Sequence, residues 1–128
     1  MFILNVESII LLHEEIIKYT GGSSEIRDRG LLEAAVNAPN QTFDNAEFYA
    51  TIEEKAARLG CGLIQNHAFV DGNKRIGTAA MLLMLKVNEI QIKYSEDDLF
   101  NIIMKVAGAE AGYDELYNWI INARDLAK

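Results

Sequence analysis

Hydrophobic residues recur three or four positions apart along most of the chain, which is the spacing of one face of an α-helix. The first such stripe predicts a helix that begins after Asn5 and stops at Gly21-Gly22, because glycine commonly ends helices. Its apolar face consists of Val6, Ile9, Ile10, Ile16 and Ile17. Asp28 can cap a second, shorter helix, which the only proline, Pro39, closes.

Two helices are predicted in the middle of the chain, with a short loop between them. The first has an amphipathic pattern and runs up to Asn66. The second begins at Asn73 and carries apolar residues on every side as far as Val87. A helix that is apolar all round belongs at the centre of a domain. The loop over residues 67–72 therefore leads directly into a buried central helix.

The last third of the chain contains two further amphipathic patterns. Ser95, with Asp98 three positions later, resembles a capping box that opens a helix. Gly108 and Gly112 end this helix, and a final amphipathic helix follows from Tyr113. The C-terminal third is therefore expected to be a pair of surface helices.

Two connections lack the helical pattern. Residues 40–45 are polar around one aromatic, so they form either a surface flap or an ordinary loop. Residues 90–94 alternate apolar and polar positions, which predicts a short extended connection. We expect an all-α fold: a compact single-domain bundle of about six helices over residues 1–128, with a short flap.

Composition and charge narrow the class of protein. Half of the 128 residues are hydrophobic, enough to close one core without a metal or a disulfide. The net charge of −7 argues against direct binding of nucleic acid, which requires a basic face. The most apolar run, residues 79–85, is far below the ~20 residues of a membrane-spanning helix. With no leader pattern before Leu12, we expect a cytoplasmic protein that does not bind membranes.

Two residues with reactive side chains are interpreted as structural. Cys61 cannot form an internal disulfide because it is the only cysteine, and it stands among small residues typical of closely packed helices. His13 falls on or near the apolar stripe of the first helix. The adjacent Glu14 and Glu15 resemble part of a zinc-protease motif, but the second histidine of that motif is absent.

The loop before the central helix has the chemistry of an anion site. Backbone N–H groups at a helix start point outward together with the positive end of the helix dipole. Gly72 lets a phosphate approach the backbone closely. Lys74 and Arg75 add positive charge, and the planar fork of Arg75 can hold two phosphate oxygens at once. This is the place where we expect a local anion site in an acidic chain.

Three other side chains of the loop can complete a reactive site. Asp71 is an oxygen ligand suited to a Mg²⁺ ion that bridges nucleotide oxygens, or else a cap of the following helix. His67 is mostly neutral at pH 7 and can take a proton from a hydroxyl, or else it caps the preceding helix. Phe69 is expected to point away from the loop mouth and anchor the loop in the core.

The stretch from His67 to Arg75 resembles the His-x-Phe-x-Asp/Glu-Gly-Asn-x-Arg signature of the Fic/Doc family, at every fixed position. The likeness extends to Leu12-His13-Glu14, to residues 27–32 and to residues 39–43, which resemble the N-terminal half of death-on-curing (Doc) members. It therefore covers nearly the whole chain. Members that transfer AMP usually carry a small residue at the position of Lys74 and a second arginine at the position of Thr78.

The resemblance implies an activity of the Doc type, which transfers the γ-phosphate of ATP to a hydroxyl of a protein, elongation factor Tu being the known target of the family. By this resemblance His67 is the base, Asp71 the Mg²⁺ ligand, and Gly72, Asn73, Lys74 and Arg75 the phosphate cradle, with Lys74 and Arg75 also stabilising the transferred group. Two alternatives stay open: an AMP transferase that modifies a protein hydroxyl, and a binding module that has lost catalysis.

The resemblance also implies two protein contacts. Residues 40–48 correspond to the flap of the family, which lays the target backbone across the site by strand addition. Many Fic proteins restrain themselves with a helix bearing Ser/Thr-x-x-x-Glu-Gly/Asn, and no such string occurs in this chain. Inhibition is then expected from outside, by a Phd-like antitoxin whose C-terminal segment docks beside the site.

Overall fold

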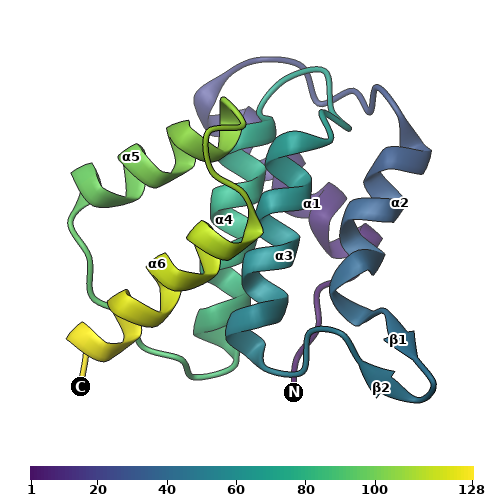
Figure 1. The fold of residues 1–128 in the computed structure, drawn as a ribbon. Helices are drawn as coiled ribbons and strands as arrows, with labels where there is room; N and C mark the ends of the chain where they lie inside the picture. The colour runs from purple at the N-terminus through teal and green to yellow at the C-terminus, as the bar shows by residue number, and fades with distance from the viewer.

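The computed structural model describes residues 1–128 and contains six α-helices, with one pair of very short strands (Figure 1). The elements are α1 (Val6–Thr20), α2 (Arg29–Asn37), η1 (Ala38–Asn40, a 3-10 turn), β1 (Thr42–Phe43), β2 (Ala46–Glu47), α3 (Ile52–Gln65), α4 (Asn73–Val87), α5 (Glu96–Ala107) and α6 (Tyr113–Leu126). The predicted all-α class and the number of helices are confirmed. No helix has the length and apolar character needed to cross a membrane.

Four helix starts follow from a side chain that accepts a hydrogen bond from the first turn. Asn5, Asp28, Thr51 and Ser95 cap α1, α2, α3 and α5 respectively. Ser95 accepts from the N–H of Asp98, as predicted. Three of these starts, at Asn5, Asp28 and Ser95, were predicted, because each capping residue is close in sequence to the groups that it satisfies.

Helices α3 and α4 lie side by side at the centre of the bundle and run in opposite directions (Figure 1). Glycines let their backbones approach each other. A Cβ at Gly77 would lie 2.5 Å from Cγ1 of Ile64 and 3.0 Å from the carbonyl oxygen of Gly60, so no side chain fits there. Cys61 is buried beside this contact, which confirms its interpretation as a packing residue.

Helix α4 is central but is buried on only one side, which corrects the expectation of an all-round apolar environment. Its buried residues share one face and are Ile76, Gly77, Ala80, Met81, Met84 and Leu85. Ala79, Leu82 and Leu83 are only partly buried. Ala79 and Leu82 instead line an open groove toward α5. The apolar residues outside the core face therefore form a surface feature.

The predicted flap exists as a β-hairpin, but it lies far from the motif loop. Strands β1 and β2 pair antiparallel across a turn at Asp44 and Asn45, both with positive φ. The hairpin joins the start of α3, whereas the motif loop follows its end (Figure 1). At 1.5 Å per residue, the 14-residue α3 separates them by roughly 20 Å. The expectation that residues 40–48 lie across the site is therefore wrong.

A buried lysine fixes the hairpin to the bundle instead. The side chain of Lys55 on α3 is 1% exposed, and its Nζ donates to Glu47 Oε1 at 2.9 Å and to the carbonyl oxygen of Pro39 at 3.1 Å. A buried ammonium group requires such partners because desolvation disfavours an unpaired charge. The hairpin is thus held at its base, at the end of α3 remote from the motif.

Candidate active site

The motif loop begins with an unusual backbone conformation at His67. Helix α3 is capped by Asn66, and His67 follows with a φ of +51°, a left-handed conformation normally taken by glycine at this position. The His67 side chain is exposed, and its imidazole makes no hydrogen bond to the protein. The His67 side chain therefore makes no capping hydrogen bond to α3, whereas its left-handed backbone ends that helix, so its role as a base stays a prediction.

The side chain of Asn73 closes the motif loop by binding to the backbone of Phe69. Its Oδ1 accepts from the N–H of Phe69 at 3.1 Å, and its Nδ2 donates to the carbonyl oxygen of Phe69 at 3.0 Å. Both polar atoms of the amide are thus used within the loop. Asn73 can contribute its backbone N–H to a phosphate cradle, but its side chain is occupied in shaping that cradle.

Phe69 anchors the loop, as predicted, and it does so against His13. The Phe69 side chain is 1% exposed, and its ring stacks on the His13 imidazole with the centroids 3.7 Å apart. His13 is fully buried, and its Nε2 donates to the carbonyl oxygen of Asp71 at 2.8 Å. The interpretation of His13 as a structural histidine is therefore confirmed: it holds the motif loop from below.

Asp71 does not cap α4, which excludes one of its two predicted roles. Helix α4 has no side-chain cap, and its N-cap residue is Gly72. Oδ2 of Asp71 instead accepts from the N–H of Ser23 at 2.8 Å. Its other oxygen has no protein donor, and the residue is exposed. One carboxylate oxygen therefore remains free to face a cation beside a bound phosphate.

A side chain at position 72 would be strained by the backbone conformation and crowded by its neighbours. The φ of Gly72 is +79°, and an added Cβ would lie 3.1 Å from Ile17 Cδ1 and 3.3 Å from His13 Nε2. The first backbone bond of α4 runs from the N–H of Ile76 to the carbonyl of Gly72. The preceding N–H groups, of residues 73–75, donate to no protein acceptor. Unpaired N–H groups at a helix start are the arrangement that the sequence predicts for an anion site.

The two basic side chains differ in how they are held. Arg75 Nη1 donates to Thr20 Oγ1 and to the carbonyl oxygen of Gly21, the latter at 3.1 Å, so its charge lies at the C-terminal end of α1. Lys74 is exposed, and its Nζ has only the sulfur of Met104 nearby, at 3.8 Å. Neither residue forms an ion pair with a carboxylate. Both charges are available to an anion.

The segment from Ser23 to Asp28 runs alongside the motif loop, and sequence reasoning missed this contact. Ile26 and Phe69 form an antiparallel bridge, with the N–H of Val70 donating to the carbonyl of Glu25 at 3.0 Å. Arg27 Nε donates to the carbonyl oxygen of His67 at 2.7 Å. In the sequence, Arg27 carries no signal beyond its place in a stretch that resembles the family.

An apolar groove opens beside the two basic residues. It has a volume of about 550 Å³ and lies between α1, α4 and α5, beginning at Lys74, Arg75 and Thr78. Its walls are mainly apolar, and they include Ile16, Ala79, Leu82, Leu99, Phe100 and Met104. Phe100 is 62% exposed, which is unusual for so large an apolar side chain. The groove therefore offers apolar contacts next to Lys74 and Arg75.

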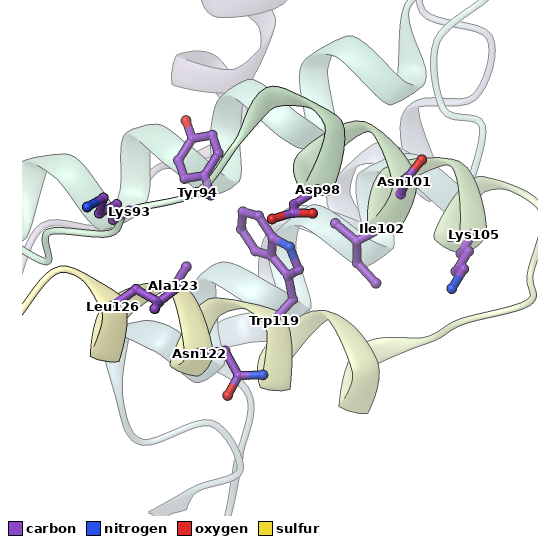
Figure 2. A pocket seen from close by; sticks show the side chains of 10 residues that line it. All are labelled: Lys93, Tyr94, Asp98, Asn101, Ile102, Lys105, Trp119, Asn122, Ala123 and Leu126. Carbon is purple, nitrogen blue, oxygen red and sulfur yellow. The ribbon is translucent and has the colours of Figure 1, made fainter.

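A second pocket, of about 330 Å³, lies between α5, α6 and the 93–94 connection (Figure 2). Trp119 stands at its centre, with its ring 5.4 Å from that of Tyr94. The pocket contains no histidine and none of the motif residues. Its carboxylate is Asp98, in the first turn of α5, and the residues that the sequence predicts as functional lie at the motif loop instead.

Comparison with known proteins agrees with this geometry. The model of the Fic/DOC family matches residues 3–85, which include α1 to α3 and the whole motif loop. The chain belongs to the Fic/DOC family, whose members generally transfer nucleotide groups to proteins. It is similar to a protein named Toxin Doc from Mycolicibacterium smegmatis (strain ATCC 700084 / mc(2)155), with 37% identity over 98 residues that cover 75% of each chain.

Proposed function

We propose that the protein is a Doc-like toxin that transfers the γ-phosphate of ATP to a serine or threonine hydroxyl of a target protein and so halts translation. The observation that carries this proposal is that the free imidazole of His67 begins the motif loop and that this loop ends at the start of α4, where the N–H groups and the charge of Lys74 are unpaired. By family resemblance the target is elongation factor Tu. ATP and this target are cytoplasmic, so we expect the protein to act in the cytoplasm.

In this mechanism His67 acts as the general base. Its exposed imidazole has no protein partner and can accept the proton of an incoming hydroxyl. The hydroxyl oxygen then forms a bond to the γ-phosphorus as the bond from that phosphorus to the bridging oxygen breaks. ADP leaves with the electron pair of that bond. Transfer of this kind depends mainly on positioning and on stabilisation of negative charge.

The phosphates are held by the first turn of α4. The free N–H groups of residues 73–75 bind phosphate oxygens, and Gly72 leaves the space for them to approach. Nη1 of Arg75 donates to Thr20 and Gly21 at the end of α1, and the other guanidinium nitrogens remain free to donate to phosphate oxygens. Lys74 supplies a mobile charge to the transferred group.

The free oxygen of Asp71 fits a Mg²⁺ ion bound through the nucleotide. No group of three or more histidine, cysteine, aspartate or glutamate side chains gathers anywhere in the protein to hold a metal by itself. Mg²⁺ commonly takes one or two carboxylates, with the rest of its ligands from phosphates and water. A single carboxylate beside the phosphate site matches that pattern. The ion would supply charge neutralisation between Asp71 and the phosphates.

Lys74 and Thr78 favour phosphate transfer over AMP transfer. Thr78 lies one turn after Lys74, and its Oγ1 donates to the carbonyl oxygen of Lys74 at 2.7 Å. The second arginine of the AMP-transferring relatives is therefore replaced by a short hydroxyl bound to its own helix. Without that guanidinium the grip on a triphosphate tail in the AMP-transfer orientation is weaker.

A labelling experiment tests the reaction type. The purified protein is incubated with bacterial lysate and with ATP labelled at either the α or the γ phosphate. We expect one protein band to gain label from the γ position only, and mass spectrometry of that band identifies the modified residue. Label from the α position only would establish the AMP transferase instead. Failure of both labels would support a binding module.

The groove between α1, α4 and α5 suits the C-terminal segment of a Phd-like antitoxin. An apolar segment laid against Phe100 and Met104 would end next to Lys74, where an acidic residue could cover the basic charge. This surface is where we expect inhibition. Addition of such a segment should block transfer, and substitution Phe100→Glu should restore transfer in its presence.

The segment beside the motif loop is better placed than the hairpin to receive the target. The N–H and carbonyl groups of Ile26 have no protein hydrogen-bond partner, although the neighbouring residues pair with the loop. An extended peptide can add to such an edge by backbone hydrogen bonds. Strand addition at residues 24–28 would place a target hydroxyl near His67, the role that the family resemblance assigned to residues 40–48.

A further inference from the structure

The guanidinium of Arg27 binds the backbone on which His67 stands. Its Nε donates to the carbonyl oxygen of His67 at 2.7 Å, and its Nη2 donates to the carbonyl oxygen of Asn66 at 3.4 Å. No other side chain bonds to the backbone of His67. We propose that Arg27 is a positioning residue, which holds the end of α3 so that the imidazole of His67 faces the transferred phosphate. The proposal rests on the function proposed above.

These two hydrogen bonds from Arg27 to the carbonyl oxygens of Asn66 and His67 are called the clamp below. The need for the clamp follows from the conformation of His67. A residue with a β-carbon is disfavoured at a φ of +51°, so the conformation persists only where surrounding contacts determine it. The carbonyl groups at the end of a helix also lack partners within the helix. Arg27 supplies two donors to this end, and its positive charge complements the negative end of the helix dipole.

The side chain of Arg27 can be removed without dismantling the segment that carries it. The backbone N–H groups of Arg27 and Asp28 both donate to the carbonyl oxygen of Ala68, at 2.8 and 3.0 Å. These bonds do not involve the Arg27 side chain. The residue is exposed, so its truncation leaves no cavity in the core. Arg27→Ala therefore removes the clamp and little else.

Lysine at this position provides an intermediate case. It keeps the positive charge near the end of α3, but its ammonium group cannot reproduce the two directions of the guanidinium fork. If only charge mattered, Arg27→Lys would behave like the unchanged protein. If the paired carbonyl contacts matter, Arg27→Lys should recover only part of the activity that Arg27→Ala loses.

Arg29→Ala is a matched control. Arg29 lies two residues further along and is also exposed, but its ion pairs are with Glu7 and Glu33. It makes no contact with the motif loop. Arg29→Ala therefore removes one positive charge near the site, as Arg27→Ala does, but leaves the hydrogen bonds to the backbone of His67 in place.

The first measurement is steady-state transfer of phosphate to the target. Arg27→Ala should lower kcat by about 10-fold to 100-fold, as expected when a catalytic group is misplaced by about an ångström, with the KM for ATP within about twofold. Arg29→Ala should leave kcat unchanged. In a His67→Ala background, Arg27→Ala should cause no additional loss. An unchanged kcat, or an equal additional loss without His67, would overturn the proposal.

The second measurement does not depend on activity. Hydrogen exchange is followed by mass spectrometry in the peptide that covers residues 66–72. Arg27→Ala should accelerate exchange in this peptide and leave α4 unaffected, while Arg29→Ala should change neither. If the unchanged protein transfers no label, the proposed function fails and exchange alone decides on the clamp. If the peptide covering residues 66–72 exchanges at the same rate in Arg27→Ala and in Arg29→Ala, the clamp is refuted whatever the activity of the variants.

Discussion

The imidazole of His13 lies almost parallel to the ring of Phe69, at an interplanar angle of 14°, and joins α1 to the motif loop beneath the phosphate site. The same imidazole donates to the carbonyl oxygen of Asp71, so one buried side chain supports two residues of the loop. Its other nitrogen, Nδ1, is buried without a partner. This histidine therefore fixes the position of the motif loop relative to the core.

His13→Ala should destabilise the protein by roughly 2–4 kcal/mol, because it removes a buried ring and a hydrogen bond together. His13→Phe keeps a ring against Phe69 but loses the bond to Asp71, and it should cost less. The free energy of unfolding in urea measures both changes. Equal costs for the two variants would show that the hydrogen bond, and not the ring contact, dominates.

Lys74→Gly should lower transfer of the γ-phosphate by roughly 10²–10³, the usual effect of losing one preorganised stabilising donor. The Lys74 side chain is exposed and its only polar contact is with the sulfur of Met104, so the loss should not come from unfolding. A paired time course with α-labelled and γ-labelled ATP checks this, with Lys74→Ala as a control for the backbone freedom of glycine. We expect at most a trace of AMP transfer, since Thr78 is not an arginine. Undiminished γ-transfer would remove Lys74 from the mechanism.

Asp71→Asn separates the two contacts of this carboxylate. The amide oxygen of asparagine can still accept from the N–H of Ser23, but the negative charge that would attract Mg²⁺ is gone. We expect transfer to be lost while the thermal unfolding midpoint changes little, and chelation of Mg²⁺ should add no further loss. Asp71→Ala should in addition lower that midpoint. Full activity of Asp71→Asn would assign Asp71 a structural role only.

Tyr113 gives the protein a distinct response to alkaline pH. Burial raises the pKa of its phenol to about 12, and the nearby carboxylate of Glu54 contributes to the shift. In the unfolded chain the pKa is about 10. A raised pKa stabilises the fold below pH 10, and this contribution is lost as the pH rises from about 10 to 12.

Tyr113→Phe isolates that contribution. The variant keeps the edge contact of the ring with Tyr49, at 5.1 Å between centroids, but it cannot ionise. The difference in unfolding free energy between the unchanged protein and Tyr113→Phe should therefore narrow or reverse between pH 10 and pH 12. A difference that is constant over this range would contradict the raised pKa.

Local signals in the sequence explain which features could be predicted. The helix starts at Asn5, Asp28 and Ser95 were predictable because each cap lies within one turn of the groups it satisfies. The unpaired N–H groups at the start of α4 were predictable because Gly72 immediately precedes the helix pattern, whereas the chemical roles of Asp71 to Arg75 stay predictions. The packing of Phe69 into the core was also predicted from its place in the loop.

The remaining features depend on contacts between distant parts of the chain. The clamp of Arg27 on His67 joins residues 40 positions apart, and no periodic pattern indicates it. The polar atoms of Asn73 could serve a phosphate or the loop, and only the fold shows that they bond to Phe69. The hairpin was assigned to the site by family resemblance, although residues 40–48 precede α3 and the motif loop follows it, which places the two at opposite ends of that helix.

The close crossing of α3 and α4 at Gly60 and Gly77 has a mechanical consequence for ligand binding. The two helices lead into and out of the motif loop, and at their crossing the backbone of Gly77 lies so close to the carbonyl oxygen of Gly60 and the side chain of Ile64 that no β-carbon fits at Gly77. The distance spanned by the loop is therefore fixed before any nucleotide arrives. Any conformational change on binding of nucleotide, target or inhibitor must then occur in the 21–28 segment and in α5, while the motif loop between α3 and α4 stays in place.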